Sequence, residues 1–185
     1  EPSSKTKMKL RAAPGAGTMY LQSECAEALA ELFAGAEEAG YKLYLKSAYR
    51  AYKTQKTMYN NRLERNNGKD DGWVSKPGAS DHQTGLGCDV VPGSWKDKSM
   101  NSNMASTPEC QWMAEHCYEY GFVIRYPEDK QDITEINYEP WHLRYVGKEV
   151  ARYIWRNGLC LEEFSCKPRL TRTSQPGEMR AGWRI

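Results

Sequence analysis

The chain holds three histidines, and two of them stand in short segments that contain the residue types of a catalytic metal site. Six residues separate His82 from Asp89, and His142 closes a Glu-Pro-Trp-His segment that begins at Glu139. A tetrahedral catalytic zinc ion takes three nitrogen or oxygen ligands from the protein and leaves its fourth position to water. His82, Asp89 and His142 therefore form a complete ligand set for one zinc ion per chain.

Glu139 lies three residues before His142 and adds a carboxylate that this ligand set does not need. Zinc hydrolases use such an acid to take a proton from water and to pass it later to the leaving amine. The alternative is a hydrogen-bonded pair of core histidines without a metal. Gly85 and Gly87 within the first segment, and the aromatic residues around His142, favour the metal site.

These segments resemble the VanY-type zinc D-alanyl-D-alanine carboxypeptidases, a family grouped with lysostaphin-like and hedgehog-like domains. The family pattern S-x-H-x-x-G-x-A-x-D is matched at residues 80–89, and E-P-W-H is matched at residues 139–142. An upstream pattern, S-x-Y-R-[ST]-x-x-x-Q, is similar to residues 47–55. The resemblance covers residues 21–161, and three ordered motifs are much harder to match by accident than one.

Two positions depart from these patterns, and both carry small residues that leave the chemistry intact. Cys88 stands where alanine is usual, and Ala51 replaces a serine or threonine. The resemblance implies that Arg50 either stabilises the negative charge on the attacked carbonyl oxygen or clamps the terminal carboxylate of the substrate. It also implies substrate contacts for four residues: Ser47, Tyr49, Gln55 and Ser80.

The resemblance implies that the chain hydrolyses the terminal D-Ala-D-Ala bond of peptidoglycan stem peptides. Three alternatives stay open: an endopeptidase of the lysin type, a dipeptidase acting on free D-Ala-D-Ala, and a zinc-bearing cell-wall binding module without turnover. Glu139 argues against the binding module, because a purely structural zinc ion needs no uncoordinated acid beside it. A wall substrate implies an extracytoplasmic location, either secreted or associated with the cell envelope.

Length and composition predict one globular domain. A chain of 185 residues can enclose a core. Its content of 39% hydrophobic and 11% aromatic residues is typical of globular proteins. No run approaches the roughly 20 apolar residues of a membrane span, and no charged-then-apolar leader begins the chain. We expect a catalytic domain at residues 19–166 between a basic segment at 1–18 and a basic tail at 167–185, and we expect a monomer.

The net charge of +2 is unevenly distributed. The two ends carry +3 and +4, which leaves −5 on the middle of the chain. The acidic middle makes nucleic acid a poor candidate for a partner. The basic ends are either solvated segments or contacts for anionic wall polymers.

The six cysteines do not indicate a disulfide framework, because the chain is long enough to fold around its own core. Cys160 and Cys166 are close enough in sequence to pair. Cys110 and Cys117 would lie about 10 Å apart along a helix, too far for a bridge. The absence of any C-x-x-C pair argues against a cysteine zinc site.

Hydrophobic periodicity predicts helices and strands in alternation. Helices are expected at residues 21–36, 51–65, 107–121 and 148–157, strands at 41–46, 86–91, 122–126 and 138–146, and a long polar loop at 93–106. Thr107 and Pro108 are a cap and a first-turn proline for the third helix. The pattern predicts an α+β domain in which helices pack against a small antiparallel sheet that carries the zinc ligands. We expect Asp81 to be exposed and His116 to be structural.

Overall fold

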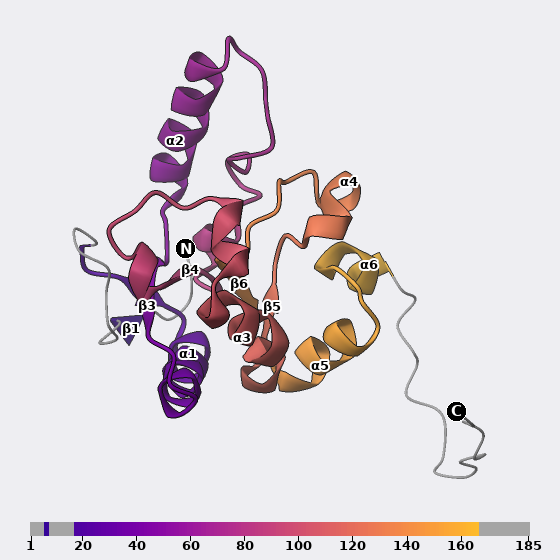
Figure 1. The fold of residues 1–185 in the computed structure, drawn as a ribbon. Coiled ribbons are helices and arrows are strands. Elements are labelled where there is room, and N and C mark those ends of the chain that lie inside the picture. Colours follow the sequence, from indigo (N-terminus) through magenta and orange to yellow (C-terminus); the bar gives the residue numbers. More distant parts are fainter. Residues whose placement is uncertain (1–5, 8–16, 167–185) are drawn as a thin grey trace.

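The structure of the protein is a computed structural model that describes residues 6–7 and 17–166 (Figure 1). The predicted basic tail at 167–185 and most of the basic segment at 1–18 lie outside these ranges. The fold is α+β, as predicted, with a four-stranded antiparallel sheet at its centre. Within the described ranges, no helix is long and apolar enough to cross a membrane.

The central sheet has the strand order β3-β4-β6-β5, and all neighbouring strands are antiparallel. Its strands are β3 (Leu43–Ser47), β4 (Gly87–Pro92), β5 (Phe122–Ile124) and β6 (His142–Tyr145). All six residues of β4 are buried, because the strand lies inside the sheet between β3 and β6. A separate two-stranded pair joins β1 (Thr6–Lys7) to β2 (Tyr20–Leu21).

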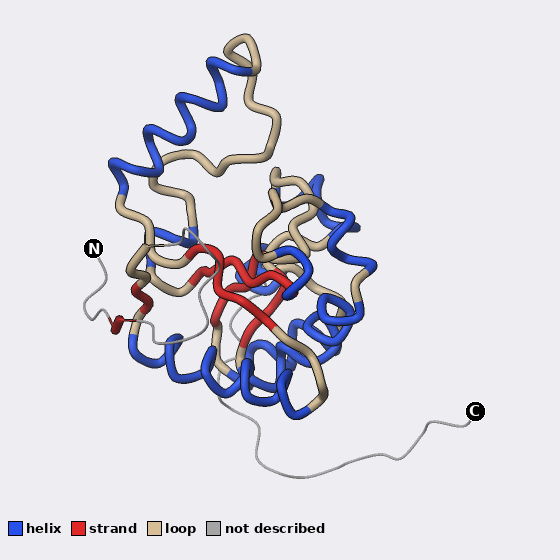
Figure 2. Tube along the Cα trace, turned by 60° about the vertical axis from the view of Figure 1, so that its left-hand side comes forward, coloured by secondary structure: helices blue, strands red, loops and turns tan. Residues whose placement is uncertain are grey.

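Three helices lie together on one side of the sheet (Figures 1 and 2). They are α1 (Ser23–Glu38), α3 (Pro108–His116) and α5 (Lys148–Arg156). The helical spacing of apolar residues in α1 puts Leu29 and Leu32 in the main core. The Thr107 hydroxyl accepts a hydrogen bond from the Cys110 backbone N–H at the start of α3, which confirms the predicted cap.

Helix α2 (Tyr52–Arg65) forms an arm that stands away from the other helices (Figures 1 and 2). Gln55 is its one buried residue, and the other side chains of the helix are exposed or partly exposed. The segment 66–80 runs back from the end of α2 to the sheet. A bidentate ion pair between Arg62 and Asp71 joins the helix to this returning segment.

Several short elements complete the described chain. They are five 3-10 turns, η1 (Asp81–Thr84), η2 (Gly93–Trp95), η3 (Ser102–Ser106), η4 (Cys117–Tyr120) and η5 (Glu128–Lys130), and two short helices, α4 (Gln131–Thr134) and α6 (Leu161–Cys166). The segment 93–106, predicted to be a loop, thus contains η2 and η3. The third predicted helix is divided into α3 and η4, and Gly121 ends it in the left-handed region with φ of 87°.

Two predicted strands are shorter than expected. The strand predicted at 138–146 begins only at His142, because the His142 backbone N–H bonds to the Glu139 carbonyl and closes a turn around Pro140. The strand predicted at 122–126 ends at Ile124. The backbone hydrogen bonds from Arg125 and Glu139 still attach this region to its neighbour.

The cysteines are all free thiols, so Cys160 and Cys166 are not bridged. Cys160 is buried whereas Cys166 is exposed, which separates the two sulfurs. Burial raises the pKa of the Cys117 thiol to about 12, so this residue is a protonated member of the core.

Candidate active site

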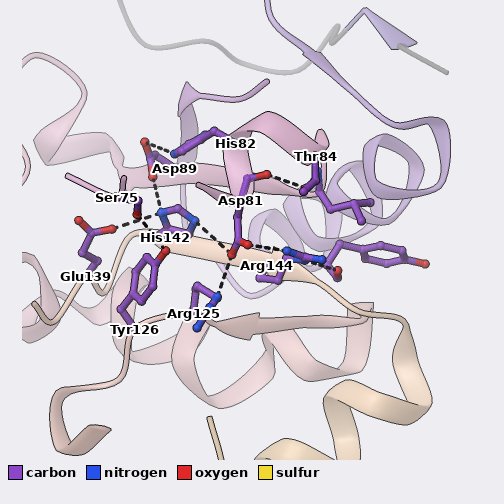
Figure 3. Close-up of polar contacts among 12 residues, drawn as sticks. Ser75, Asp81, His82, Thr84, Asp89, Arg125, Tyr126, Glu139, His142 and Arg144 are labelled. Carbon is purple, nitrogen blue, oxygen red and sulfur yellow. Dashed lines mark hydrogen bonds and ion pairs between the residues drawn. The ribbon is translucent and has the colours of Figure 1, made fainter. Parts of the chain in front are cut away.

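The three predicted ligands come from three elements and meet beside the central strands (Figure 3). Asp89 on β4 and His142 on β6 are directly opposite each other in the strand register. His82 lies on η1, which ends at Gly85 with φ of 73° and then leads into β4. The prediction that the sheet carries the ligands is therefore confirmed for Asp89 and His142, while His82 comes from the preceding turn.

One ligand atom from each of the three residues lies within 4.8 Å of the others, a spacing that could hold one metal ion. Asp89 Oδ2 is 3.4 Å from His82 Nε2, and Asp89 Oδ1 is 3.4 Å from His142 Nδ1. A tetrahedral ion with bonds of about 2.0 to 2.1 Å separates its ligand atoms by about 3.3 to 3.4 Å. All three side chains are buried, and Asp89 Oδ1 has no hydrogen-bond partner within the described chain. Such an unsatisfied oxygen fits a site built for a cation.

A backbone contact orients His82 toward this centre. Its Nδ1 lies 2.7 Å from the Ala48 carbonyl oxygen, which can only accept, so Nδ1 carries the proton and donates it. In the neutral ring, Nε2 is then the nitrogen without a proton, and it faces Asp89 at 3.4 Å. The Arg50 backbone N–H donates in turn to the His82 carbonyl, which links the upstream motif to the ligand turn.

The electrostatics of the cluster also suit a cation. Burial opposes ionisation of Asp89, but His82, His142 and Arg50 favour it and together hold the pKa of this carboxyl below its usual range. Burial lowers the pKa of His142, whereas Glu139 and Asp89 raise it, and the result is a pKa above the ordinary value. A metal ion bound at His142 Nδ1 would have to displace the proton from that nitrogen.

Glu139 is the carboxylate beside the ligand set. Its Oε2 is 3.2 Å from His142 Nδ1, and the residue is 9% exposed. Its backbone N–H donates to the Tyr126 carbonyl at 3.1 Å, which holds the turn before β6 in place. The acid is therefore next to the metal position and at the wall of a cavity.

Arg50 brings a fixed cation to the same cavity. Its Nη1 donates to Gln55 Oε1 at 2.8 Å and its Nη2 donates to Ser47 Oγ at 3.2 Å. Burial lowers the pKa of the guanidinium, although Asp89 and Glu139 oppose this shift. Arginine stays charged at physiological pH in any case, so the site holds a permanent positive charge.

The cavity has a volume of about 220 Å³ and joins the ligand cluster to the arm formed by α2 and the segment after it. Ser80, Glu139 and the three ligands line its inner end together with Arg50. Its apolar wall is made by Met58, Trp73, Val74, Met100 and Trp141. An apolar wall with a few polar and charged groups at one end is typical of a ligand-binding pocket.

One protein family, VanY, described as D-alanyl-D-alanine carboxypeptidase, matches residues 18–148 of this chain. The chain belongs to this family. The match includes all three ligands, Glu139 and Arg50, which agrees with the resemblance found in the sequence motifs.

VanY-family relatives are similar over most of the chain. A Bacillus subtilis protein named only as a candidate carboxypeptidase, YodJ, is 43% identical over 146 residues, which are 78% of this chain and 53% of the relative. The D-alanyl-D-alanine carboxypeptidase of Enterococcus faecalis is 34% identical over 74% of this chain and 52% of its own length. The chain thus spans about half the length of these curated relatives.

Solved structures of related proteins share the fold. The LD-carboxypeptidase LdcB, described in work on peptidoglycan recognition, is 39% identical with a TM-score of 0.83 over 89% of this chain and 78% of that one. VanYB in complex with D-alanine-D-alanine is 30% identical, with a TM-score of 0.70. The match covers 90% of this chain and 92% of the VanYB chain. A mutant of the D,D-pentapeptidase VanY in complex with Zn(II) has a TM-score of 0.69 and 30% identity over 85% and 89%.

The residues that the VanY resemblance assigned to substrate contact have different positions. Ser80 and Gln55 line the cavity, but Ser47 and Tyr49 do not. Gln55 is 1% exposed and uses its amide to hold Arg50 and the Ser75 carbonyl. Ser47 likewise accepts from Arg50. Ser47 thus lies behind Arg50, and substrate contact by these four residues stays a prediction.

Two residues of this VanY-family site were missed or misjudged from the sequence. Asp81 is 6% exposed and ion-paired, so its predicted exposure is wrong; two arginines distant in sequence cover its carboxylate. Tyr126 lines the cavity and packs edge-on against His142, and burial raises the pKa of its hydroxyl to about 12. Of these contacts, the sequence could have indicated only the one between Asp81 and Arg144. Arg144 lies two residues after His142 and therefore on the same face of β6.

Proposed function

We propose that this chain is a zinc metallo-carboxypeptidase that removes the terminal D-alanine from peptidoglycan stem peptides ending in D-Ala-D-Ala. The observation that carries the proposal is the position of Glu139, an acid outside the ligand set whose Oε2 is 3.2 Å from a ligand nitrogen. The relatives named as D-alanyl-D-alanine carboxypeptidases support the same reaction.

Zinc is the metal that suits two imidazoles and one carboxylate in this spacing. The ligands would be His82 Nε2, the Asp89 carboxylate and His142 Nδ1. When bound there, zinc supplies Lewis acidity and lowers the pKa of water toward about 7. The Zn(II) complex of the related VanY enzyme supports this choice of metal.

Glu139 moves the protons of the reaction. Its Oε2, which faces the ligand atoms, takes a proton from the attacking water and delivers it to the nitrogen of the departing D-alanine. Because the residue is 9% exposed, bulk water has little access to the proton in transit. The backbone bond to Tyr126 keeps the acid in this place during both transfers.

Arg50 can act on either of two anions. The charge that gathers on the attacked carbonyl oxygen is one, and the terminal carboxylate of the peptide is the other. Gln55 and Ser47 hold the guanidinium from one side, so its orientation is set before the substrate binds. Both roles need a planar donor in a fixed position.

The two roles of Arg50 predict different kinetics for Arg50→Lys, which keeps the charge but loses the planar fork. If Arg50 stabilises the oxyanion, kcat and kcat/KM fall together by about 10²-fold to 10³-fold. If it binds the terminal carboxylate, KM takes most of the loss and the parent enzyme handles a C-terminally amidated peptide poorly. Steady-state kinetics on both peptides distinguish these results. Parental kinetics in Arg50→Lys and Arg50→Ala alike would exclude Arg50 from the reaction.

A second candidate is an L,D-carboxypeptidase, which would release D-alanine from an L-residue of a shorter stem peptide. This candidate is favoured by the TM-score of 0.83 with LdcB and by DacB of Streptococcus pneumoniae, an L,D-carboxypeptidase 35% identical with a TM-score of 0.66. DacB is matched over 79% of this chain and 77% of its own. Met58 and Trp73 on the apolar wall are 39% and 38% exposed and offer surface for a long aliphatic side chain.

Mass analysis of purified muropeptides tests the proposed reaction. Incubation with the zinc-loaded protein is expected to shorten a pentapeptide stem by one alanine and to leave a tetrapeptide stem unchanged. Loss of one alanine from the tetrapeptide would replace the D,D assignment by the L,D assignment. Release of a larger fragment would indicate an endopeptidase, and cleavage of free D-Ala-D-Ala alone would indicate a dipeptidase.

The remaining alternative is a zinc-bearing binding module of the cell wall. Binding of muropeptides without any product, under conditions where zinc is fully bound, would support it and overturn the enzymatic proposal. The proposed substrate exists in the bacterial wall, so we propose that the protein works outside the cytoplasm. Fractionation of producing cells, with the protein found in the cytoplasmic fraction alone, would contradict that location.

A further inference from the structure

Asp81 lies between two arginines, Arg125 and Arg144 (Figure 3), and Arg125 links it to a fourth charge, Glu162. Its Oδ1 accepts from Arg144 Nη1 at 2.5 Å, and its Oδ2 accepts from Arg125 Nε at 2.9 Å. The remaining nitrogens of the Arg125 guanidinium donate to both carboxylate oxygens of Glu162. Two acids and two arginines therefore face one another, and Asp81, which is 6% exposed, has both of its carboxylate oxygens paired with an arginine.

This network reaches the ligand cluster at the far side of the His142 ring. His142 Nδ1 faces Asp89 and Glu139, whereas Nε2 points to Asp81 Oδ2 at 4.0 Å (Figure 3). Nε2 is buried and has no hydrogen-bond partner among residues 6–7 and 17–166. An imidazole that binds a metal through one nitrogen holds its proton on the other nitrogen, and that N–H needs an acceptor or a negative charge nearby.

We propose that Asp81 is a positioning residue for His142: its carboxylate favours the form of the ring with the proton on Nε2 and leaves Nδ1 for the metal. At 4.0 Å the contact in this structure is electrostatic, since it is longer than a hydrogen bond. The inference rests on the proposed zinc site but on no particular substrate.

The strand register explains how Asp81 reaches this position. Gly87 is opposite Arg144, and Asp89 is opposite His142, so all four lie on one face of the sheet. A Cβ atom at Gly87 would lie 2.7 Å from the Asp81 Cβ, so only glycine leaves room for the η1 turn to pack there. Because Gly87 has no side chain, Asp81 can lie over the β4–β6 pair, between Arg144 and His142.

The outer end of the network comes from α6. Glu162 belongs to this helix, which follows the residues 18–148 matched by the VanY family. Its side chain is 31% exposed, compared with 12% for Arg125 and 8% for Asp81. The network thus connects Glu162, a partly exposed acid on α6, through Arg125 to Asp81, a buried acid beside His142. In this way α6 supports the proposed metal site.

The test measures zinc affinity directly, by competition with a chromogenic chelator and without substrate. Asp81→Asn, which keeps the shape of the side chain and removes its charge, is expected to weaken zinc binding by about 10-fold to 100-fold. Glu162→Gln should weaken it in the same direction and by less. Cobalt(II) bound in place of zinc should show a changed absorption spectrum in Asp81→Asn, because the ring orientation of a ligand changes.

Glu163→Gln is the matched control. Glu163 is the next residue of α6 and pairs with Lys130, which does not contact Asp81. Its zinc affinity should equal that of the parent. If folded Asp81→Asn bound zinc as tightly as the parent, the inference would be overturned. If Asp81→Asn does not fold, parental zinc affinity in Glu162→Gln would overturn it. Absence of zinc binding by the parent protein would instead refute the proposed function.

Discussion

Replacing Glu139 with glutamine is expected to lower kcat on a D-Ala-D-Ala peptide by about 10² or more while zinc remains bound. The amide has nearly the same shape as the carboxylate, but it cannot accept a proton from water or deliver one to the leaving nitrogen. Glu139 is not one of the three clustered ligands, so the metal content should stay at one ion per chain. Steady-state kinetics and metal analysis of the same preparation measure both quantities.

Glu149→Gln is the control for this substitution. Glu149 is exposed near the start of α5 and does not line the cavity, so the same chemical change there should leave kcat within about twofold. Activity of Glu139→Gln within a few fold of the parent would assign Glu139 a structural role. Loss of zinc from this variant would make Glu139 a ligand.

Replacing His82 with alanine is expected to remove zinc and, with it, all measurable hydrolysis. Three protein ligands are the usual number for a catalytic zinc ion, and the remaining Asp89 and His142 would leave the metal weakly held. His82 also donates to the Ala48 carbonyl, so some loss of stability accompanies the loss of metal. The zinc content after dialysis against a weak chelator, together with circular dichroism, separates the two effects.

His116→Ala provides the comparison within the same chain. His116 is the one histidine outside the cluster; it pairs with Glu119 at 2.9 Å and stacks on Trp112. This variant should keep one zinc ion and parental activity. If His82→Ala retained a full zinc content while folded, the ligand assignment and the mechanism built on it would both be refuted.

The sequence by itself determined the ligand types, the spare acid and most of the helices. His82 and Asp89 lie within one short segment, and Glu139 and His142 lie within another, so each pair is held together by local chain geometry. Helical periodicity and the Thr107 cap are equally local, and the structure confirms both. Residue types and short spacings are sufficient to predict a contact when the interacting groups are neighbours in the chain.

The pairing of these segments could not be read from the sequence. Asp89 meets His142 because β4 and β6 are adjacent, although β5 lies between them in the chain. The upstream motif showed Arg50 as a functional residue but did not show that Ser47 and Gln55 hold it. A motif records which residues belong together, but it does not show that Gln55 lines the cavity while Ser47 lies behind Arg50.

Asp81 shows most clearly what the sequence could not predict. From the sequence it is an acid in a polar turn, and such residues are mostly exposed. Its partners Arg125 and Arg144 lie 44 and 63 residues away, and only the folded sheet brings them to it. The cost of burying a carboxylate depends on the charges that surround it, and these are supplied by segments that are distant along the chain. The ligands of the site were therefore determined by local sequence, whereas the environment that orients them was decided by tertiary packing.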